Sequence, residues 1–590
     1  MPDKAKNKLK INKNITYIIL LVIILLQLGR IIYSFVYLKE DFHSDEIWSF
    51  GLSNSYYQPF IYQSADHMDL INKNTWFSSQ VMKDYLTVSR NQRFAYDSVY
   101  FNQVHDYHPP FYYFILHTIC SFFPEKFSVW YGFVINIFTF IVSMLFMYKL
   151  AMRVLKSDIL SITACAFYGF SVGAVNTYVF VRMYCLLTLI SIVLVYIHTF
   201  LLNDKISKKT FFLLFIISLL GCLTHHFFIP YAGLISMCFC CYFLIKKKWK
   251  TFLMYSITML SSVGVSVLLF PETIDHVLSG RINDTKFPFS WQIRMAINCV
   301  LSEIFGKRIS VVPKISYTAL LIEIVCVTVI ISPLFFLFRN ENWFKNLLMF
   351  LKRIISNLIK RIRNSNPVSI AMIISSGGLI LLTALTVSMM MMSATADRYI
   401  FNVFPLICIV SVLIVSGLIS CVTSRKFVSE SITIAVTALF CVLSNICGSY
   451  NYFFTKPEDA VSIEQYIAGE DCVFISDEYW LLTCFTRIGM KADNIYATTS
   501  DDLKKRIDII PDSLSQENEM YIFVNNGVFF QEYEDGATGG KLPEIGRSID
   551  QSGKLKQDEF EKILLGKYSM CEYEGYDTVF ERRFSVYRVK

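Results

Sequence analysis

The chain has 590 residues, of which 54% are hydrophobic and only 17% are charged, and its formal net charge is +8. This composition excludes an ordinary soluble protein, because many apolar runs reach the roughly 20 residues that cross a bilayer. The basic residues stand in short segments between these runs, which excludes a nucleic-acid-binding surface. We expect them to set the orientation of the chain in the plasma membrane instead.

The first apolar run, residues 15–38, follows a basic N-terminus, residues 1–14. The run is longer than the core of a cleaved signal peptide and has no small-residue cleavage site, so we expect a retained first span. In all, the sequence predicts an α-helical polytopic membrane protein with about 11–13 transmembrane helices. The further runs lie near residues 127–148, 158–180, 184–202, 210–228, 230–245, 251–270, 315–338, 367–392, 399–421 and 427–447.

Lysine and arginine favour the cytoplasmic side of a membrane. Eleven crossings that begin inside place each basic cluster inside, including the segment 339–365, provided that residues 110–148 cross only once. The run 111–123 has only about 13 residues, short for a span, so we expect it to be re-entrant or shallow. Alternatively it crosses fully, and the cluster Lys149–Lys156 departs from the charge rule.

The outer loop 39–109 opens with the pair Asp45-Glu46. Carboxylates beside lipid are expensive to bury, which points to a function there. We assign Asp45 and Glu46 as catalytic residues, one of which removes a proton from an acceptor hydroxyl or amine as general base. The alternative is that the pair lies at the start of a surface helix, although Ser44 and Ile47 form no capping box.

The same loop ends in Asp106 and His108, followed by two prolines that fix the backbone and start the next helix. Beside Asp106, His108 could hold a donor phosphate or orient an acceptor. It could also be no more than the first residue of a helix. We assign both residues to substrate binding.

Two short motifs, Arg182-Met-Tyr184 and Asp397-Arg398-Tyr399, stand at the outer ends of spans. Two arginines at one depth suit a lipid phosphate or diphosphate, because guanidinium matches phosphate geometry and stays charged. Each arginine alone could be a snorkelling anchor. We assign Arg182, Tyr184, Arg398 and Tyr399 to substrate binding.

His225 lies at the outer end of another span and is expected to line the same cavity. No acid accompanies it at helical spacing, so we expect neither a metal site nor a cofactor. The outer loop 271–314 is long enough for a mobile flap, but its charges are those of a solvated face. Its basic residues are Arg281, Lys286, Arg294, Lys307 and Arg308.

From about residue 450 the composition becomes that of a soluble domain. Short apolar runs at 472–476 and 520–524 predict buried strands, and the stretches 458–467 and 557–565 predict helices. We therefore expect a soluble α/β domain over residues 450–590, after a transmembrane domain over residues 15–449. The odd number of crossings places this domain outside the cell.

These motifs together resemble the membrane-embedded GT-C glycosyltransferases, in particular the bacterial branch related to protein O-mannosyltransferases and aminoarabinose transferases. The resemblance covers about residues 15–420 and rests mainly on Asp45-Glu46 and on Asp106-Tyr-His-Pro-Pro-Phe-Tyr-Tyr113. It implies a GT-C fold, a polyprenyl-phosphate sugar donor, transfer on the outer face and Asp45 as the base. It also implies donor-phosphate contacts from Arg182 and Arg398, and a protein, lipid or glycan as acceptor.

The sequence thus predicts an inverting glycosyltransferase. The alternative is a polytopic lipid or glycan transporter or flippase, which would bury charges within its spans and contain paired repeats. In this chain the polar residues gather at one membrane face instead. A sensor anchored by its spans is a further alternative, but it needs no Asp-Glu pair.

Overall fold

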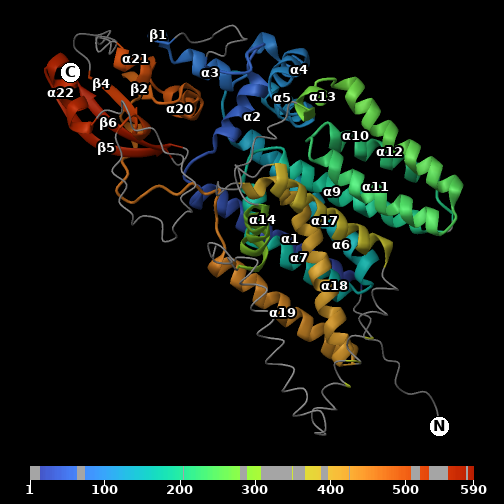
Figure 1. Ribbon diagram of the computed structural model, residues 1–590. Coiled ribbons are helices and arrows are strands. Elements are labelled where there is room, and N and C mark those ends of the chain that lie inside the picture. The colour runs from blue at the N-terminus through green and yellow to red at the C-terminus, as the bar shows by residue number, and fades with distance from the viewer. Residues whose placement is uncertain are drawn as a thin grey trace, which may run out of the picture.

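The chain folds into a bundle of long apolar helices that carries a small β-sheet at one end (Figure 1). The two parts share one continuous hydrophobic core. The computed structural model describes residues 13–62, 73–203, 205–278, 289–306, 349, 352, 356, 366–386, 396–423, 425–505, 519–529, 556–579 and 582–590.

Eight helices of the described residues are long and apolar enough to cross a membrane, or nine if α7 and α8, bent by 59°, form one broken span. The protein is therefore a multi-pass membrane protein. The span expected near 210–228 is a 15-residue helix, α10, and the span expected at 315–338 lies outside the described residues. The bundle helices are α1 (Lys13–Tyr33, continued by the π-helical turn η1, Ser34–Leu38), α6 (Trp130–Leu155), α7 (Asp158–Gly169), α8 (Val172–Val179), α9 (Tyr184–His198, continued by η3, Thr199–Leu202), α10 (Lys208–Cys222), α11 (Phe228–Ile245), α12 (Trp249–Leu269), α14 (Phe289–Phe305), α17 (Pro367–Thr386), α18 (Phe404–Val422, preceded by η5, Ala396–Val403) and α19 (Lys426–Cys447).

The region between the first loop and α6 contains one short apolar helix, α5 (Phe111–Ser121). Its 11 residues extend about 16 Å, against about 30 Å for the hydrocarbon core of a bilayer. This length agrees with the shallow alternative for residues 111–123. In the loop 271–314 only α13 (Thr273–Leu278) and α14 are described, and the side chains of its five expected basic residues lie outside the described part, as does nearly all of 339–365.

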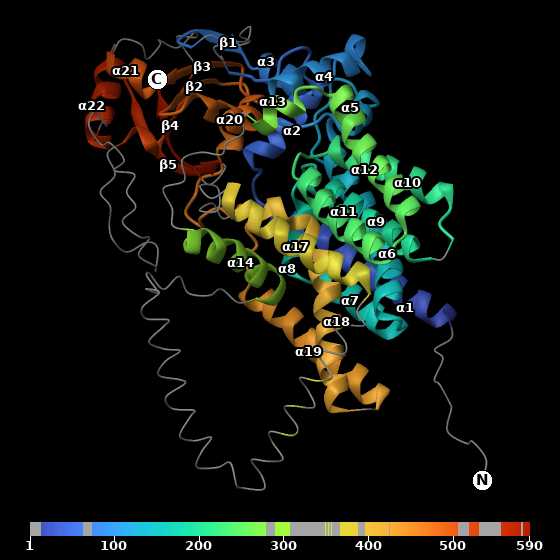
Figure 2. The ribbon, with the colours of Figure 1, turned by 45° about the vertical axis from the view of Figure 1, so that its right-hand side comes forward.

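The first loop folds into short helices above the bundle (Figure 2). Packing there is close: a Cβ at Gly51 would lie 2.0 Å from a ring carbon of Tyr85, so only glycine lets α3 approach α2 at this point. Tyr85 is buried and donates its hydroxyl to the carbonyl of Pro59, at 3.0 Å. The elements of the loop are α2 (Ser44–Asn54), β1 (Trp76–Ser78), α3 (Gln80–Leu86), η2 (Arg90–Gln92) and α4 (Tyr96–His105).

The sheet has six strands in the order β1-β3-β2-β4-β6-β5. Strand β2 pairs in parallel with β3 and β4, and the other pairs are antiparallel. The strands expected at 472–476 and 520–524 are confirmed as β2 and β4, and the helix expected at 557–565 is confirmed as α22. The elements are β2 (Asp471–Ser476), η7 (Tyr479–Leu481), α20 (Leu482–Gly489), β3 (Asn494–Thr499), α21 (Ser500–Lys505), β4 (Met520–Asn525), η9 (Asn526–Val528), α22 (Gln557–Lys567), β5 (Cys571–Val579) and β6 (Arg582–Val589).

The helix expected over 458–467 is wrong, because this segment forms only one 3-10 turn, η6 (Ile463–Gln465). Its backbone is held by β5 instead: Val461 donates its N–H to the carbonyl of Tyr576, at 2.9 Å. The hydroxyl of Tyr576 also donates to Asp459, at 2.5 Å. The segment therefore runs beside the sheet rather than coiling.

The two faces of the sheet have different partners, because successive side chains of a strand point to opposite sides. On β2, Cys472 and Phe474 join the core that continues into the bundle, while Val473 and Ile475 belong to a second core with Phe560 of α22. Both faces are thus covered.

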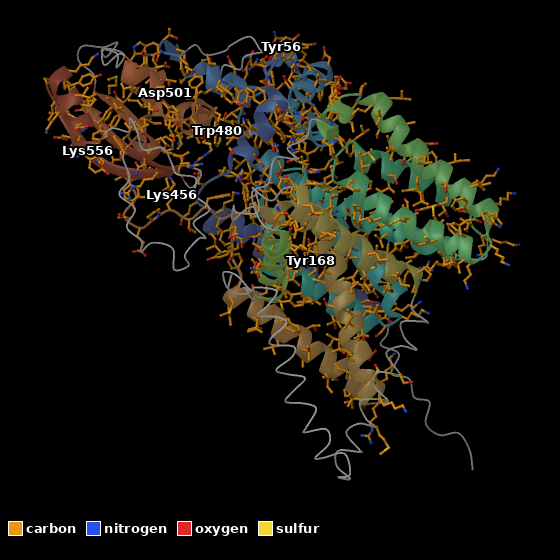
Figure 3. All side chains as sticks on the ribbon, in the orientation of Figure 1. Tyr56, Tyr168, Lys456, Trp480, Asp501 and Lys556 are labelled. Atoms are coloured by element: carbon orange, nitrogen blue, oxygen red, sulfur yellow. The ribbon has the colours of Figure 1, made fainter. Side chains whose placement is uncertain are left out.

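The sheet is joined to the first loop at several points. Strand β1 of the loop pairs with β3, and Trp48 of α2 packs against Trp480 at a ring distance of 6.1 Å. Arg487 of α20 forms an ion pair with Asp41, at 3.4 Å. Figure 3 shows Trp480 where the orange α20 meets the blue helices of the loop. The loop and the sheet therefore form one unit above the bundle.

Candidate active site

The acidic pair stands at the first turn of α2, and a capping box fixes the start of this helix. His43 is the N-cap: its Nδ1 accepts the N–H of Asp45 at 3.0 Å, and Glu46 Oε2 accepts the N–H of His43 at 2.8 Å. The frame Ser44–Ile47, which was considered from the sequence, forms no capping box, whereas the box in the structure begins one residue earlier, at His43. Glu46 supplies the carboxylate of this capping box. The alternative interpretation, in which the acidic pair lies at the start of a helix, therefore accounts for part of the role of Glu46.

The two acids of the pair face different surroundings. Glu46 is fully buried and accepts from Lys39 Nζ through both oxygens, at 2.9 Å each. Its Oε1 also accepts the backbone N–H of Val181, at 2.8 Å. Burial raises the pKa of Glu46 and lowers the pKa of Lys39, while their mutual attraction opposes both shifts. Glu46 is thus tied to protein groups on every side.

The linker between α8 and α9 is held against α2 by the same residue. Glu46 binds the N–H of Val181, and the hydroxyl of Ser49 on α2 donates to the Val181 carbonyl at 3.2 Å. The next residue, Arg182, donates from Nη1 to the Asp45 carbonyl at 2.9 Å and to Ser49 Oγ at 3.2 Å. The capped start of α2 therefore positions Arg182 beside Asp45.

The carboxylate of Asp45 points toward a second arginine. Its Oδ2 lies 3.5 Å from Arg398 Nε, in the 3-10 segment that precedes α18, and its side chain keeps 14% of its surface exposed. Burial alone would raise the pKa of Asp45, but the nearby positive charges of His43, Arg398 and Arg182 hold it below its ordinary value. Burial also lowers the pKa of His43 to about 3, so its imidazole is neutral at neutral pH. At that pH the positive charges that lower the pKa of Asp45 are therefore those of Arg398 and Arg182.

Asp106 and His108 approach the same cluster from the end of the loop. His108 Nδ1 lies 2.8 Å from Asp106 Oδ2, which orients the ring, and 3.4 Å from Arg182 Nη2. Burial would raise the pKa of Asp106, but the neighbouring His108 and Arg182 hold it below its ordinary value. By contrast His105 turns away and bonds the carbonyl of Phe101, at 2.8 Å.

Aromatic rings and a histidine surround the arginines. The ring of Tyr184 lies 5.4 Å from His225 and 6.1 Å from Tyr399, and His225 lies 5.8 Å from His108. The guanidinium of Arg398 lies 4.9 Å over the ring of Tyr399. Eight of the nine expected site residues are thus brought together, and the ninth, Glu46, lies behind them.

The buried polar atoms of the cluster that have no hydrogen-bond partner among the described residues include Arg182 Nε and His225 Nε2. His225 Nδ1 accepts the N–H of Phe227, at 3.0 Å, so Nε2 carries the proton of the neutral ring. Buried donors without a partner are rare in native proteins. Both are suited to a ligand with acceptor oxygens. In the described ranges no three His, Cys, Asp or Glu side chains gather as a metal-binding group.

Two residues of this region, Lys39 and His43, were not singled out in the sequence, and both anchor the pair. Tyr113 of α5, the last residue of the motif that begins at Asp106, lies 5.6 Å from the guanidinium of Arg182. His43 had a detectable signal, because a polar residue three positions before a glutamate is the pattern of a capping box. A lysine at the end of a span, as at Lys39, has the pattern of a snorkelling anchor and gives no such signal.

No protein-family model matches the chain, and no curated protein matches it. Among solved structures it is similar to ArnT from Cupriavidus metallidurans, in the apo state and bound to undecaprenyl phosphate, each with 9% identity, a TM-score of 0.45 and 97% of both chains covered. It is also similar to the archaeal oligosaccharyltransferase AglB from Archaeoglobus fulgidus in complex with an inhibitory peptide and a dolichol-phosphate. That similarity has 9% identity and a TM-score of 0.42, and covers 82% of this chain and 64% of the other.

Proposed function

We propose that the protein is an inverting glycosyltransferase of the GT-C type, which moves a hexosyl or pentosyl group from a polyprenyl-phosphate or related lipid donor to an acceptor. One observation carries the proposal: the Asp45 carboxylate lies 3.5 Å from Arg398 in a cluster that also contains Arg182 and His108. A partly exposed base beside two phosphate-binding cations is what transfer from a sugar phosphate requires.

In the proposed reaction Asp45 accepts the proton of an acceptor hydroxyl as the oxygen of that hydroxyl attacks the anomeric carbon. The bond from this carbon to the phosphate oxygen breaks, and the lipid phosphate leaves with the bonding electrons. Attack from the face opposite the phosphate inverts the anomeric configuration. Because the lowered pKa makes Asp45 a weak base, it suits a step in which the proton moves late, after the leaving group has begun to depart.

We assign the leaving phosphate to Arg182 and Arg398. Guanidinium groups remain charged and grip phosphate oxygens through two N–H groups, which stabilises the charge that develops on the leaving group. His225 Nε2 and the unpartnered Nε of Arg182 provide further donors. Asp106 orients His108 toward the same region, and Tyr184 and Tyr399 form its wall.

We assign Glu46 a positioning role rather than the role of the base. Both of its oxygens bind Lys39, and they also hold the backbone of His43 and Val181. A carboxylate engaged in this way is a poor proton acceptor for a substrate.

We further propose that the site and the domain over residues 450–590 face the outside of the plasma membrane, where the acceptor is a glycan, lipid or protein. The basic N-terminus and the basic loops between spans support this orientation. On a background without native cysteines, single cysteines in the 39–109 loop and in the 450–590 domain should react with an impermeant thiol reagent on intact cells. A cysteine in the segment 339–365 should not, and the reverse pattern would contradict the orientation.

The decisive experiment incubates the purified protein with a polyprenyl-phosphate sugar and an envelope extract as the source of acceptor. We expect release of polyprenyl phosphate and incorporation of the sugar, both slowed at least about a hundredfold in Asp45→Asn. A transporter or flippase would move the intact lipid across vesicles without cleaving it, and intact donor after prolonged incubation would refute the transferase.

A further inference from the structure

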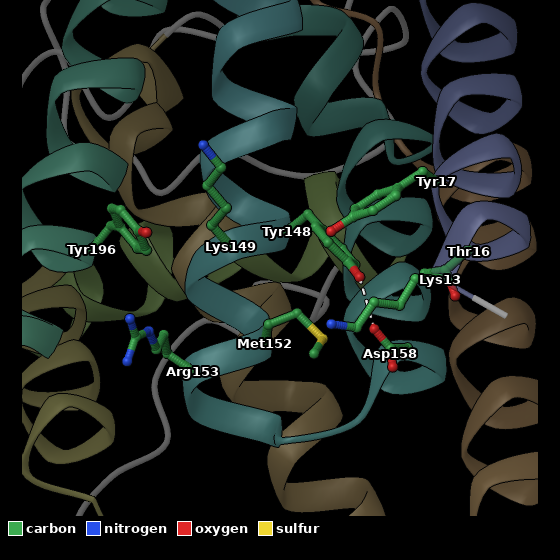
Figure 4. Close-up of a pocket in the computed structure, with 9 residues that line it drawn as sticks. All are labelled: Lys13, Thr16, Tyr17, Tyr148, Lys149, Met152, Arg153, Asp158 and Tyr196. Atoms are coloured by element: carbon green, nitrogen blue, oxygen red, sulfur yellow. Dashed lines mark hydrogen bonds between the residues drawn. The ribbon is translucent and has the colours of Figure 1, made fainter. Parts of the chain in front are cut away.

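A pocket of about 390 Å³ opens between α1, α6, α7 and α9 at the end of the bundle where α1 begins (Figure 4). Asp45 lies beyond the other end of the same helix. With its continuation, α1 has 26 residues, which corresponds to about 39 Å of rise. The pocket is therefore separate from the site described above and lies toward the opposite membrane surface.

The pocket has an excess of positive charge. Lys13 of α1 and Lys149 and Arg153 of α6 line it, and among the described residues none of the three forms an ion pair. Its single acid, Asp158, accepts the hydroxyl of Tyr148 at 2.9 Å. Figure 4 shows Lys13 and Asp158 beside α1, with Lys149 and Arg153 farther along α6.

The two cations of α6 are held at the pocket by aromatic rings. Lys149 Nζ lies 5.0 Å from the ring centre of Phe146, and the Arg153 guanidinium lies 4.9 Å from that of Phe200. Lys149 and Arg153 are four residues apart, so they stand one above the other on a single helix face. Figure 4 shows the Lys149 amine directed upward and the Arg153 guanidinium directed to the lower left, so the two cations border the pocket at separate points.

A buried hydroxyl also belongs to the pocket. Thr16 lines it with only 2% of its surface exposed, and its Oγ1 has no hydrogen-bond partner among the described residues. Such a group costs free energy unless something else satisfies it. A phosphate oxygen would accept its proton, and the surrounding cations would balance the charge of the phosphate.

The surroundings favour a lipid over a free ion. The outward faces of the two helices beside the pocket are apolar: Tyr17 and Leu21 of α1 are 57% and 56% exposed, and Leu145, one turn from Lys149, is 43% exposed. These faces border the acyl chains, so the cations stand at the depth of the headgroups. We propose that this pocket binds the phosphate headgroup of an anionic phospholipid in the leaflet opposite the Asp45 site.

The proposal concerns a binding site, and it holds whether or not the chain transfers sugar. Under the proposed orientation the leaflet is the cytoplasmic one. The bound lipid would fasten the starts of α1 and α7 to the end of α6.

The test is lipid binding by the purified full-length protein, measured by native mass spectrometry with phosphatidylglycerol and with phosphatidylcholine. Each basic residue near an anionic lipid contributes about a fivefold factor to binding, so Lys149→Gln/Arg153→Gln should weaken phosphatidylglycerol binding about 25-fold. The matched control, Lys246→Gln/Lys250→Gln, removes two exposed charges, one just after α11 and one in the first turn of α12, at residues that do not line the pocket. It should keep the affinity of the wild type.

A second variant tests the pocket without changing its charge. Thr16→Val should weaken phosphatidylglycerol binding about threefold or more, the order expected for one lost hydrogen bond, while the thermal midpoint without lipid stays within a few degrees. Equal losses of phosphatidylglycerol binding in Lys149→Gln/Arg153→Gln and in the control Lys246→Gln/Lys250→Gln would overturn the proposal, because they would mean general attraction of the lipid to a basic surface. Full binding in Lys149→Gln/Arg153→Gln would overturn it as well. Displacement of the lipid by inorganic phosphate at matched concentration would assign the pocket to a free anion instead.

Discussion

Replacing Asp45 by asparagine removes the proposed base and little else. The backbone contacts of this residue do not involve its carboxylate: its N–H donates to His43 and its carbonyl accepts from Arg182. Asparagine has the same size, so the start of α2 and the position of Arg182 should be kept. The Arg398 side chain, 3.5 Å from Oδ2, loses a charged neighbour. Binding of the donor phosphate should therefore be unchanged or tighter.

The expected loss of rate follows from the role. General-base catalysis contributes about 10²–10⁴-fold, which corresponds to about 3–5 kcal/mol of transition-state stabilisation. We expect single-turnover transfer from a labelled polyprenyl-phosphate sugar to fall by that factor in Asp45→Asn, with a normal thermal midpoint and elution profile.

The matched control is Asp41→Asn, which removes another buried acid of the same loop, paired with Arg487 rather than with the site. It should lower the thermal midpoint but leave the transfer rate of folded protein within about threefold of wild type, because its ion pair joins the loop to the sheet. A folded Asp45→Asn protein that loses less than about a hundredfold would refute the assignment. A comparable loss in folded Asp41→Asn would refute it too.

Three further outcomes follow from the site. Glu46→Gln should lower stability by about 3–5 kcal/mol, since it leaves Lys39 buried without its carboxylate, and adding Lys39→Met should restore part of the thermal midpoint; a silent single variant would contradict the positioning role. Arg398→Lys should weaken donor binding while the protein stays folded, because lysine lacks the planar fork, whereas unchanged affinity would identify a snorkelling anchor. Because its pKa is lowered, Asp45 is ionised at every pH above the ordinary pKa range of an aspartate. Arg398→Gln removes one of the positive charges that lower this pKa. The acid limb of kcat/KM should then move to higher pH, and an unmoved limb would separate Arg398 from the base.

The sequence predicted which residues gather in one cluster better than it predicted the surroundings of each. Charged groups such as Asp45, Arg182 and Arg398 stand out because they interrupt apolar runs at the same membrane face. Adjacent positions on a helix point about 100° apart, so only one acid of the pair can face the substrate. Which one does so depends on Val181 and Lys39, which reach Glu46 through tertiary contacts that no local pattern records.

The fold shows a similar limit. Apolar runs of 20 residues predict spans because the bilayer fixes their length, and the buried strands at 472–476 and 520–524 were recognisable from composition. The pairing of Trp76 in the first loop with Tyr496 in the sheet was not, because it joins segments more than 400 residues apart in the chain. The helix predicted over residues 458–467 is wrong for a related reason: the contact of this segment with β5 overrides its local helical pattern.

The positive charge of the two arginines has two opposing effects on the proposed reaction. In the proposed reaction the positive charge of Arg182 and Arg398 holds the leaving phosphate, yet the same charges lower the pKa of Asp45 and make it a weaker base. A bound donor resolves the conflict, because a phosphate on Arg182 and Arg398 neutralises much of the charge that acts on the carboxylate. The pKa of Asp45 should then rise, so that the residue becomes a stronger base only when a donor is present. Such coupling favours deprotonation of the acceptor in the donor complex, and it explains physically why a base and two phosphate-binding cations should share one small cluster.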